Sequence, residues 1–221
     1  KLKDKVMERN HRGIIAREGL PFILPPAVFT LSAAALGYRF SAFVLFLITF
    51  FVVWFFRNPE RVTPQEPAYI ISPADGKVIV VEENAAHELL AAPAKKVSIF
   101  MNVFNVHVNR APCAGRVEEI RYYPGRFLSA NLDKASAENE RNAVLLERKD
   151  GRRILTIQVA GLIARRIVCW ISKGMEVEKG ERFGMIRFGS RLDVYMPPET
   201  RILVKTGAKV RAGETPIGEL P

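Results

Sequence analysis

The sequence predicts a mainly β domain, built as a compact barrel or sandwich, that follows an N-terminal helical hairpin. Residues 1–19 are polar and basic, whereas residues 20–56 are almost wholly apolar, with Arg39 as the one charged residue. From about residue 64 onward, short apolar and β-branched runs are separated by Gly, Pro, Asn or Asp. Such runs are typical of strands joined by turns, so we expect a β domain over residues 57–221.

The apolar segment predicts a pair of helices. A bilayer core needs about 20 apolar helical residues per crossing. Residues 20–56 are too many for one crossing and just enough for two short helices, Leu20–Leu36 and Phe40–Phe56, with Gly37-Tyr38-Arg39 as the turn. A signal peptide fits poorly because no small-residue cleavage site follows. Prolines interrupt the first half. A re-entrant or tilted hairpin is therefore an alternative to two helices that fully span the membrane.

Charge indicates where such a hairpin would lie. Basic residues flank both of its ends, and the positive-inside tendency then places both ends in the cytoplasm. We therefore expect the cytoplasmic face of the inner membrane. The net charge of +10 favours anionic partners. The basic residues are spread along the chain and the aromatic ones concentrate in the hairpin, so a nucleic-acid partner is not expected.

The strands are predicted from nine apolar runs. These are Lys77–Val81, Val97–Phe104, Val117–Tyr123, Ala143–Leu146, Ile154–Val159, Ile167–Ile171, Met185–Phe188, Leu192–Tyr195 and Ile202–Val204. The polar stretch Ser129–Asn142 is predicted as a long loop.

A short sequence pattern occurs twice near the C-terminus. The segments Lys173–Glu181 and Thr206–Glu214 both contain Gly-x-x-Val-x-x-Gly-Glu. Such turns recur in flattened barrels of the biotinyl/lipoyl-carrier kind, although two independent β-turns would give the same pattern. A carrier module would need a lysine in an exposed hairpin, typically between methionines, and no Met-Lys-Met occurs.

Cysteine and histidine usage argues against a structural metal. The cysteines, Cys113 and Cys169, lie far apart and are expected to be buried free thiols. The histidines are His11, His87 and His107, too few and too scattered to predict a zinc site.

Two further motifs could carry chemistry, although each has an ordinary explanation. Asp75, in Ser-Pro-Ala-Asp-Gly-Lys, lies just before a predicted strand, where an Asp commonly caps a turn. His107 lies on an apolar strand with Arg110 three residues on. Odd separations in a strand place side chains on opposite faces, so these two would share a site only if the strand ended or bulged between them.

The third motif is the Gly189-Ser190 step. It is not a Gly-x-Ser-x-Gly nucleophile elbow, because no glycine stands two residues after Ser190. Glycine leaves its carbonyl open and tolerates strain, so Ser190 Oγ could attack the Gly189 carbonyl. An oriented Asp–His pair could take the hydroxyl proton. Read locally, however, Gly-Ser usually marks only a turn.

Read together, the motifs resemble a known family. The ordered set, which resembles the short bacterial and archaeal phosphatidylserine decarboxylases, is Phe55–Arg61, Ser-Pro-Ala-Asp75-Gly, Asn-Val-His107-Val-Asn-Arg-Ala-Pro, Gly125-Arg126-Phe127, Glu138–Asn142 and Phe-Gly189-Ser190. The resemblance runs from about residue 12 to the C-terminus. It implies cleavage between Gly189 and Ser190, which gives a β-chain of residues 1–189 and an α-chain of residues 190–221 that begins with a pyruvoyl group.

The resemblance also implies roles for individual residues. Asp75, His107 and Ser190 match the self-processing triad. Arg110, Arg126 and Arg141 are candidate cations for a phosphodiester headgroup. The chain departs from longer relatives in two places: Arg110 stands where a second histidine would fall, and Arg191 stands where Thr often follows the serine.

The implied chemistry needs neither a metal nor pyridoxal phosphate. The pyruvoyl ketone would take up the amine of phosphatidylserine and draw electrons as carbon dioxide leaves, giving phosphatidylethanolamine. The implied partners are the phospholipid membrane, the two self-derived chains and, by analogy alone, a second copy in a homodimer. A related serine phospholipid (archaetidylserine) and a non-enzymatic, membrane-anchored carrier-like module remain alternatives.

Overall fold

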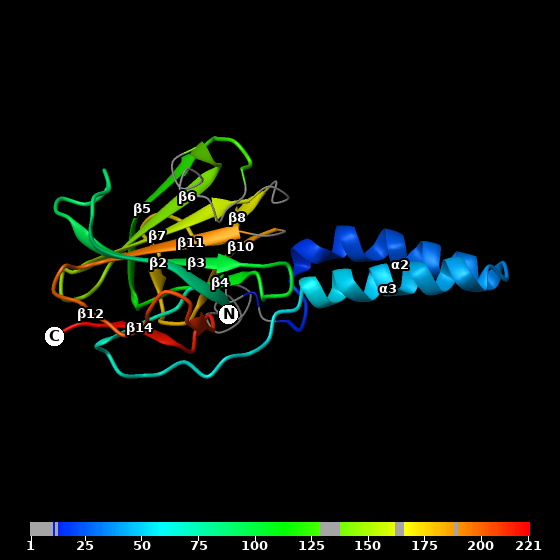
Figure 1. The fold of residues 1–221 in the computed structure, drawn as a ribbon, viewed down its shortest axis with the longest axis horizontal. Helices are drawn as coiled ribbons and strands as arrows, with labels where there is room; N and C mark the ends of the chain where they lie inside the picture. Colours follow the sequence, from blue (N-terminus) through cyan, green and yellow to red (C-terminus); the bar gives the residue numbers. More distant parts are fainter. Residues whose placement is uncertain (1–10, 12, 129–137, 162–165, 188–189) are drawn as a thin grey trace. The chain divides into compact units, whose positions relative to one another are not determined.

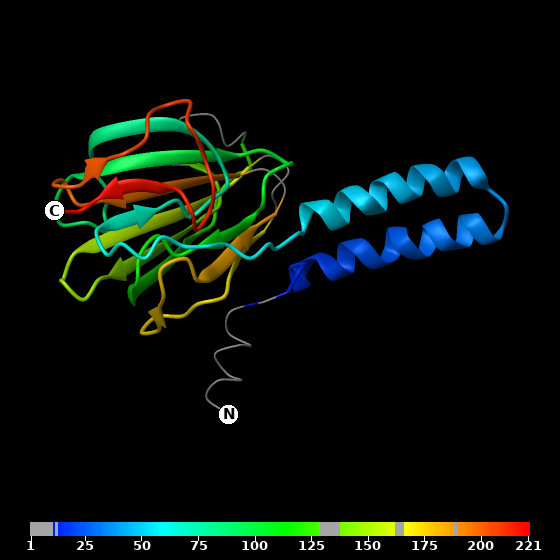
Figure 2. The same cartoon turned by 90° about the horizontal axis from the view of Figure 1, so that it is seen from below.

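The chain folds into two compact units. The computed structural model describes residues 11, 13–128, 138–161, 166–187 and 190–221, and Figures 1 and 2 show it from two directions. One unit is residues 1–60 and the other is residues 61–221. The first is helical and the second is mainly β, which confirms the predicted fold class at this level.

The first unit is a helical hairpin. It contains the short 3₁₀-helix η1 (Arg17–Gly19) and the helices α2 (Leu20–Ala35) and α3 (Arg39–Phe55), which lie side by side (Figure 2). Both helices begin and end within one residue of their predicted bounds. Gly37 connects them with a φ of 81°, a conformation that glycine adopts without a steric penalty.

The hairpin carries its polar contact inside and its apolar side chains outside. Thr30 and Thr49 share a hydrogen bond of 3.2 Å between their Oγ1 atoms across the two helices. No residue of α2 is buried, and large apolar side chains such as Phe29, Leu31 and Phe50 are more than half exposed. By length and composition alone, Arg17–Ala35 could cross a membrane, and Arg39–Phe55 is a shorter apolar helix.

The described part of the second unit consists of strands of two to ten residues. They are β1 (Tyr69–Ile71), β2 (Gly76–Ala85), β3 (Ala94–Met101), β4 (Val108–Arg110), β5 (Gly115–Tyr123), β6 (Arg141–Glu147), β7 (Arg153–Ala160), β8 (Ile167–Cys169), β9 (Glu176–Val177), β10 (Arg182–Ile186), β11 (Ser190–Met196), β12 (Arg201–Ile202), β13 (Lys209–Val210) and β14 (Pro216–Glu219).

The strands form one large antiparallel sheet and two small ones. The large sheet has eight strands in the order β13-β2-β3-β11-β7-β6-β5-β9. It curls into a half-barrel, as Figure 1 shows. The small sheets have the orders β1-β14-β12 and β4-β10-β8. Strand β11 therefore lies in the interior of the large sheet, hydrogen-bonded to β3 on one side and to β7 on the other.

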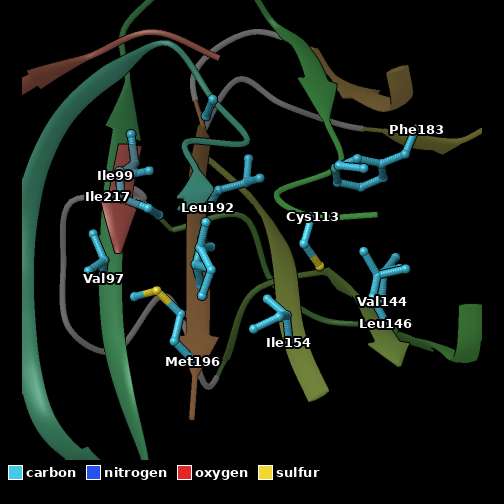
Figure 3. Packing of buried hydrophobic residues seen from close by; sticks show 14 of the residues in the cluster. Val97, Ile99, Cys113, Val144, Leu146, Ile154, Phe183, Leu192, Met196 and Ile217 are labelled. Atoms are coloured by element: carbon cyan, nitrogen blue, oxygen red, sulfur yellow. The ribbon is translucent and has the colours of Figure 1, made fainter. Parts of the chain in front are cut away.

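The main core fills the concave side of the curled sheet. Figure 3 shows Val97 and Ile99 from β3, Leu192 and Met196 from β11, and Ile154 from β7 packed together. Burying one such side chain fully stabilises the fold by about 1.5–3 kcal/mol. Alternate residues of the same strands form a second cluster on the other face, which includes Leu155, Ile157 and Tyr195.

Each of the predicted strands is present, with shifted ends. All nine predicted runs overlap an observed strand, although Phe188 and residues 129–137 lie outside the described part of the chain. The predicted loop Ser129–Asn142 extends too far, because β6 already begins at Arg141. The nine runs leave out β1, β4, β9, β13 and β14, which have two to four residues each. β8 and β12 are equally short, but they lie within longer apolar runs. The strand expected at His107 begins one residue later, at Val108.

The twofold sequence pattern corresponds to a structural repeat. Gly207 N donates to Val78 O at 2.8 Å, and Gly174 N donates to Val117 O at the same distance. Each turn thus attaches a two-residue strand, β13 or β9, to the start of a long strand, β2 or β5. The long strands also begin alike, with Pro-x-x-Gly-Lys-Val at residues 73–78 and Pro-x-x-Gly-Arg-Val at residues 112–117. The second unit therefore contains two similar halves.

Candidate functional site

Ser190 is the first residue of β11 and faces the concave side of the large sheet. Its cross-strand partners are Met101 on β3 and Ala160 on β7, and both of these belong to the main core. Ser190 is fully buried. Its Oγ has no hydrogen-bond partner among the residues that the structure describes. A buried hydroxyl without a partner costs free energy and needs an explanation, of which a catalytic role is one.

His107 is fully buried and precedes β4 directly. Its Nδ1 lies 3.0 Å from the carbonyl oxygen of Asn105. A carbonyl only accepts, so Nδ1 carries the proton, and in the neutral ring Nε2 is the nitrogen that acts as an acceptor. The carbonyl of His107 accepts a hydrogen bond from Ile186 N at 3.4 Å. This contact places His107 beside the end of β10, four residues before Ser190.

Asp75 lies in a buried ion pair. Its carboxylate accepts from Arg61 Nη2 at 3.0 Å and from the Ala212 amide at 2.8 Å, and Arg61 also contacts Glu214. The described contacts of Asp75 are thus with Arg61 and Ala212, and the predicted Asp75–His107 pair is not among them. Arg61 ends the Phe55–Arg61 motif, which by itself indicates no role for this side chain. An Arg in an irregular segment has no local signal for a partner 14 residues on.

Arg110 lies beside the Asp75 turn. Its amide donates to Pro73 O at 3.0 Å and its Nη1 donates to Gly180 O at 2.8 Å. Strand β4 spans only Val108–Arg110, and the facing register on β10 shifts between Arg182 and Gly184. The extra residue of this bulge is on β10, but His107 lies just before the first residue of β4, so the strict alternation of a strand does not extend from His107 to Arg110.

The other two candidate arginines lie elsewhere. Arg126 has a side chain that is 77% exposed and pairs with Glu138 at 3.5 Å. The Arg141 guanidinium lies over the Tyr123 ring, with 4.3 Å between Cζ and the ring centroid. Arg141 pairs with Val159 on β7, and Val159 pairs with Arg191 on β11. Because side chains alternate along a strand, Arg141 lies on the opposite face of the sheet from Ser190.

The thiols are free and unreactive in character. Cys113 is buried, and burial raises the pKa of its thiol to about 12. Cys169 is half-buried, and desolvation raises its pKa as well. Among the described residues, no group of three or more His, Cys, Asp or Glu side chains could hold a metal ion.

Comparison with known proteins identifies the family. Residues 48–218 match the family model described as phosphatidylserine decarboxylase. A protein of Syntrophus aciditrophicus (strain SB), named phosphatidylserine decarboxylase proenzyme, is 60% identical over 94% of this chain and 98% of its own length. The chain belongs to the phosphatidylserine decarboxylase family. Equally named proteins of Desulfotalea psychrophila and Burkholderia mallei (strain SAVP1) are 50% and 49% identical, over 93% and 94% of this chain and 96% of their own lengths.

Membership of the phosphatidylserine decarboxylase family confirms the resemblance predicted from the motifs. It also confirms that the chain is an enzyme of the carboxy-lyase class. The similarity covers both the helical unit and the β unit, since more than nine-tenths of the chain aligns with each relative. Gly189, the predicted residue before the cut, lies outside the described residues, whereas Ser190 lies inside them.

Proposed function

We propose that the chain decarboxylates phosphatidylserine to phosphatidylethanolamine with a pyruvoyl group that it makes from Ser190. Family membership supports the reaction, and the word proenzyme in the names of the relatives supports a processed chain. The observation that carries the self-cleavage is the buried Ser190 hydroxyl, which has no hydrogen-bond partner among the described residues. A hydroxyl that is not held by a hydrogen bond can turn toward the peptide bond that precedes it.

The self-cleavage would proceed in two parts. The Ser190 hydroxyl proton passes to a base, and Oγ bonds to the Gly189 carbonyl carbon. The Gly189–Ser190 C–N bond then breaks and its nitrogen takes a proton, which leaves an ester. Loss of the Ser190 α-proton breaks the Cβ–Oγ bond, releases the Gly189 carboxylate and leaves dehydroalanine. Water hydrolyses this group to the pyruvoyl cap and ammonia.

His107 is the proposed base. The Asn105 carbonyl fixes its Nδ1 as the donor, so Nε2 is the nitrogen that can accept a proton. Asp75 stays the proposed third member of the triad. The hydrogen bond that its carboxylate accepts from the Ala212 amide attaches the Ser72–Asp75 turn to the segment after Ser190. In many triads the third group orients the histidine, and here the Asn105 carbonyl already supplies one such contact.

The pyruvoyl group would supply the ketone that takes up the substrate amine and accepts electrons as carbon dioxide leaves. Of the three arginines suggested by the sequence, Arg110 and Arg126 are the proposed cations for the phosphodiester, and Arg126 has the more exposed side chain. Arg141 lies on the opposite face of the sheet from Ser190 and is less suited to this role. The repeated turn is the feature that favours a biotinyl/lipoyl-like barrel. A homodimer stays a prediction.

Intact mass and denaturing electrophoresis test the self-cleavage. The parent chain should split before Ser190, and the small fragment should be blocked to Edman sequencing. Ser190→Ala should stay a single chain and form no phosphatidylethanolamine from phosphatidylserine. The exposed serine variant Ser172→Ala serves as the control and should split as the parent does. A Ser190→Ala chain that still splits at this place would contradict the mechanism.

The hairpin is proposed to hold the enzyme at the cytoplasmic face of the inner membrane. Its outer surface is apolar, and its Thr30–Thr49 hydrogen bond is internal, as expected of helices in lipid. The intact chain should float with phospholipid vesicles in a density gradient. A chain with Phe29, Leu31 and Phe50 changed to Gln should stay at the bottom. Flotation of that variant equal to the parent would contradict membrane attachment through the hairpin.

A further inference from the structure

A row of buried amide side chains crosses the interior of the β unit. Asn142 Nδ2 donates to Gln158 Oε1 at 3.0 Å, and Gln158 Nε2 donates to Asn109 Oδ1 at 2.8 Å. All three side chains are buried. Each amide donates to the next in the same direction, so the row ends in the Nδ2 group of Asn109. Hydrogen bonds in such chains polarise one another.

The register of the sheet locates the end of this row. Gln158 on β7 pairs with Leu192 on β11, and Met101 on β3 pairs with Ser190 on β11. Asn109 contacts both Gln158 and Met101. Since β11 lies between β3 and β7, the Asn109 amide must cross the concave face of β11 near Ser190.

The last donor of the row has a poor acceptor. Asn109 Nδ2 is directed to Met101 Sδ at 3.8 Å, and a thioether is a weak hydrogen-bond acceptor. Nearby, Ser190 Oγ has no partner among the described residues. A buried donor with a weak acceptor and a buried hydroxyl without a partner among the described residues therefore lie over the same face of β11. Each such group needs an explanation in a folded protein.

A glycine keeps the row in place. Gly184 on β10 pairs with Asn109, and a Cβ at this position would lie 2.4 Å from Val168 O and 3.0 Å from Gln158 Nε2. The absence of a side chain thus leaves room for the Gln158 amide to reach Asn109. Because Asn109 Oδ1 is occupied by Gln158, the orientation of the Asn109 amide is fixed with its donor away from Gln158.

We propose that Asn109 is the donor that stabilises negative charge on Ser190 Oγ during self-cleavage. This inference rests on the proposed function. As the Ser190 proton passes to the base, charge grows on Oγ, and an N–H of Asn109 turns from the thioether to that oxygen. Asn109 neither gains nor loses a proton, and the bond-making and bond-breaking steps stay those given above. Preorganised donors in a buried site stabilise developing charge far better than water does.

The variant Asn109→Asp separates the donor from the packing. Aspartate has nearly the same shape and keeps an oxygen that accepts from Gln158 Nε2, but its ionised form has no proton to donate. Uncleaved chains are collected in denaturant, transferred to native buffer over a series of pH values and followed by electrophoresis. At neutral pH we expect cleavage about 100-fold or more slower than in the parent, which is the usual effect of losing one such donor.

The pH profile is the readout that a structural role would not change. A protonated carboxyl group can donate, so the ratio of the parent's rate to the Asn109→Asp rate should shrink as the pH falls. Protonation of the base slows the parent and the variant alike, so its effect cancels in the ratio of the two cleavage rates at each pH. A parental rate at neutral pH, or a slowing by the same factor at every pH, would overturn the proposal.

Further variants keep the test decisive. Thr156 lies on the same face of β7 as Gln158, and its buried hydroxyl also has no partner among the described residues. The control variant Thr156→Val removes this hydroxyl and should cleave at the parental rate. If Asn109→Asp does not fold, Asn109→Ser and Asn109→Ala are compared. Asn109→Ser keeps a hydrogen-bond donor and should cleave faster than Asn109→Ala. Equal cleavage rates of these two variants would reject Asn109 as the donor. Splitting of Ser190→Ala would instead refute the proposed function itself.

Discussion

Arg191, the residue directly after the proposed nucleophile, is buried in an ion pair. Its Nε lies 2.6 Å from Asp193 Oδ1, and its Nη2 donates to Ser98 Oγ at 2.9 Å on the neighbouring strand β3. Both side chains are almost fully buried. Arg191 therefore attaches the start of β11 to β3 from the face opposite to Ser190. This contact gives a structural role to the residue that departs from the Thr of longer relatives.

Removing the Asp193 charge should destabilise the β unit strongly. Asp193→Asn leaves the Arg191 guanidinium buried without a counter-charge, which typically costs about 3–5 kcal/mol. The measurement is urea unfolding in the uncleaved Ser190→Ala background. Glu219→Gln, which breaks the exposed pair with Arg201, should cost about 1 kcal/mol or less. A loss of unfolding free energy from Asp193→Asn that is as small as the loss from Glu219→Gln would show that the buried pair is not important for stability.

At the residue level, the sequence indicates some site residues far better than others. Ser190, His107 and Asp75 stand in motifs whose order can be recognised. Asn109 stands in the same motif as His107, yet an Asn in a short strand is no sign of a buried donor. Its role depends on Gln158 and Met101, which are 49 and 8 residues away. Long-range pairing of this kind comes from sheet register, which composition and spacing do not give.

At the scale of elements, the two halves of the β unit share a close approach of backbones. A Cβ on Gly76 would lie 2.2 Å from Phe100 O, and one on Gly115 would lie 2.5 Å from Glu147 O. Both glycines are the first residues of long strands, β2 and β5. The repeated turns could be predicted from the sequence. The similar starts of β2 and β5 are too short to indicate a repeat by themselves, and it is the pairing of the turns with these strands that shows their equivalence.

The two glycine positions should therefore respond alike to alanine. Gly76→Ala and Gly115→Ala must displace a neighbouring backbone, and we expect each to cost about 3 kcal/mol in unfolding free energy, the upper end of the usual cost of overpacking. Gly151→Ala is the comparison, because Gly151 has a φ of 78° and nothing near its missing Cβ. That change should cost only about 1–2 kcal/mol, the penalty of the backbone conformation. A smaller effect at Gly76 or Gly115 would contradict the close approach.

At the scale of the whole molecule, the division into a helical and a β unit could be predicted from hydropathy alone. An apolar run with one charged residue and a series of short β-branched runs have different periods, and both are local signals. Strand order could not be predicted in this way. Lys209 on β13 pairs with Lys77 on β2, 132 positions earlier, and no local pattern specifies which strand a two-residue segment will join.

The strands after residue 190 are distributed among those before it. β11 lies between β3 and β7, β13 pairs with β2, and β14 pairs with β1. After cleavage the two pieces would therefore stay together as one folded body. Once unfolded, however, they would have to find each other by diffusion, so recovery of the native state would become bimolecular. The yield after removal of denaturant should rise with protein concentration for the processed enzyme and be independent of it for Ser190→Ala.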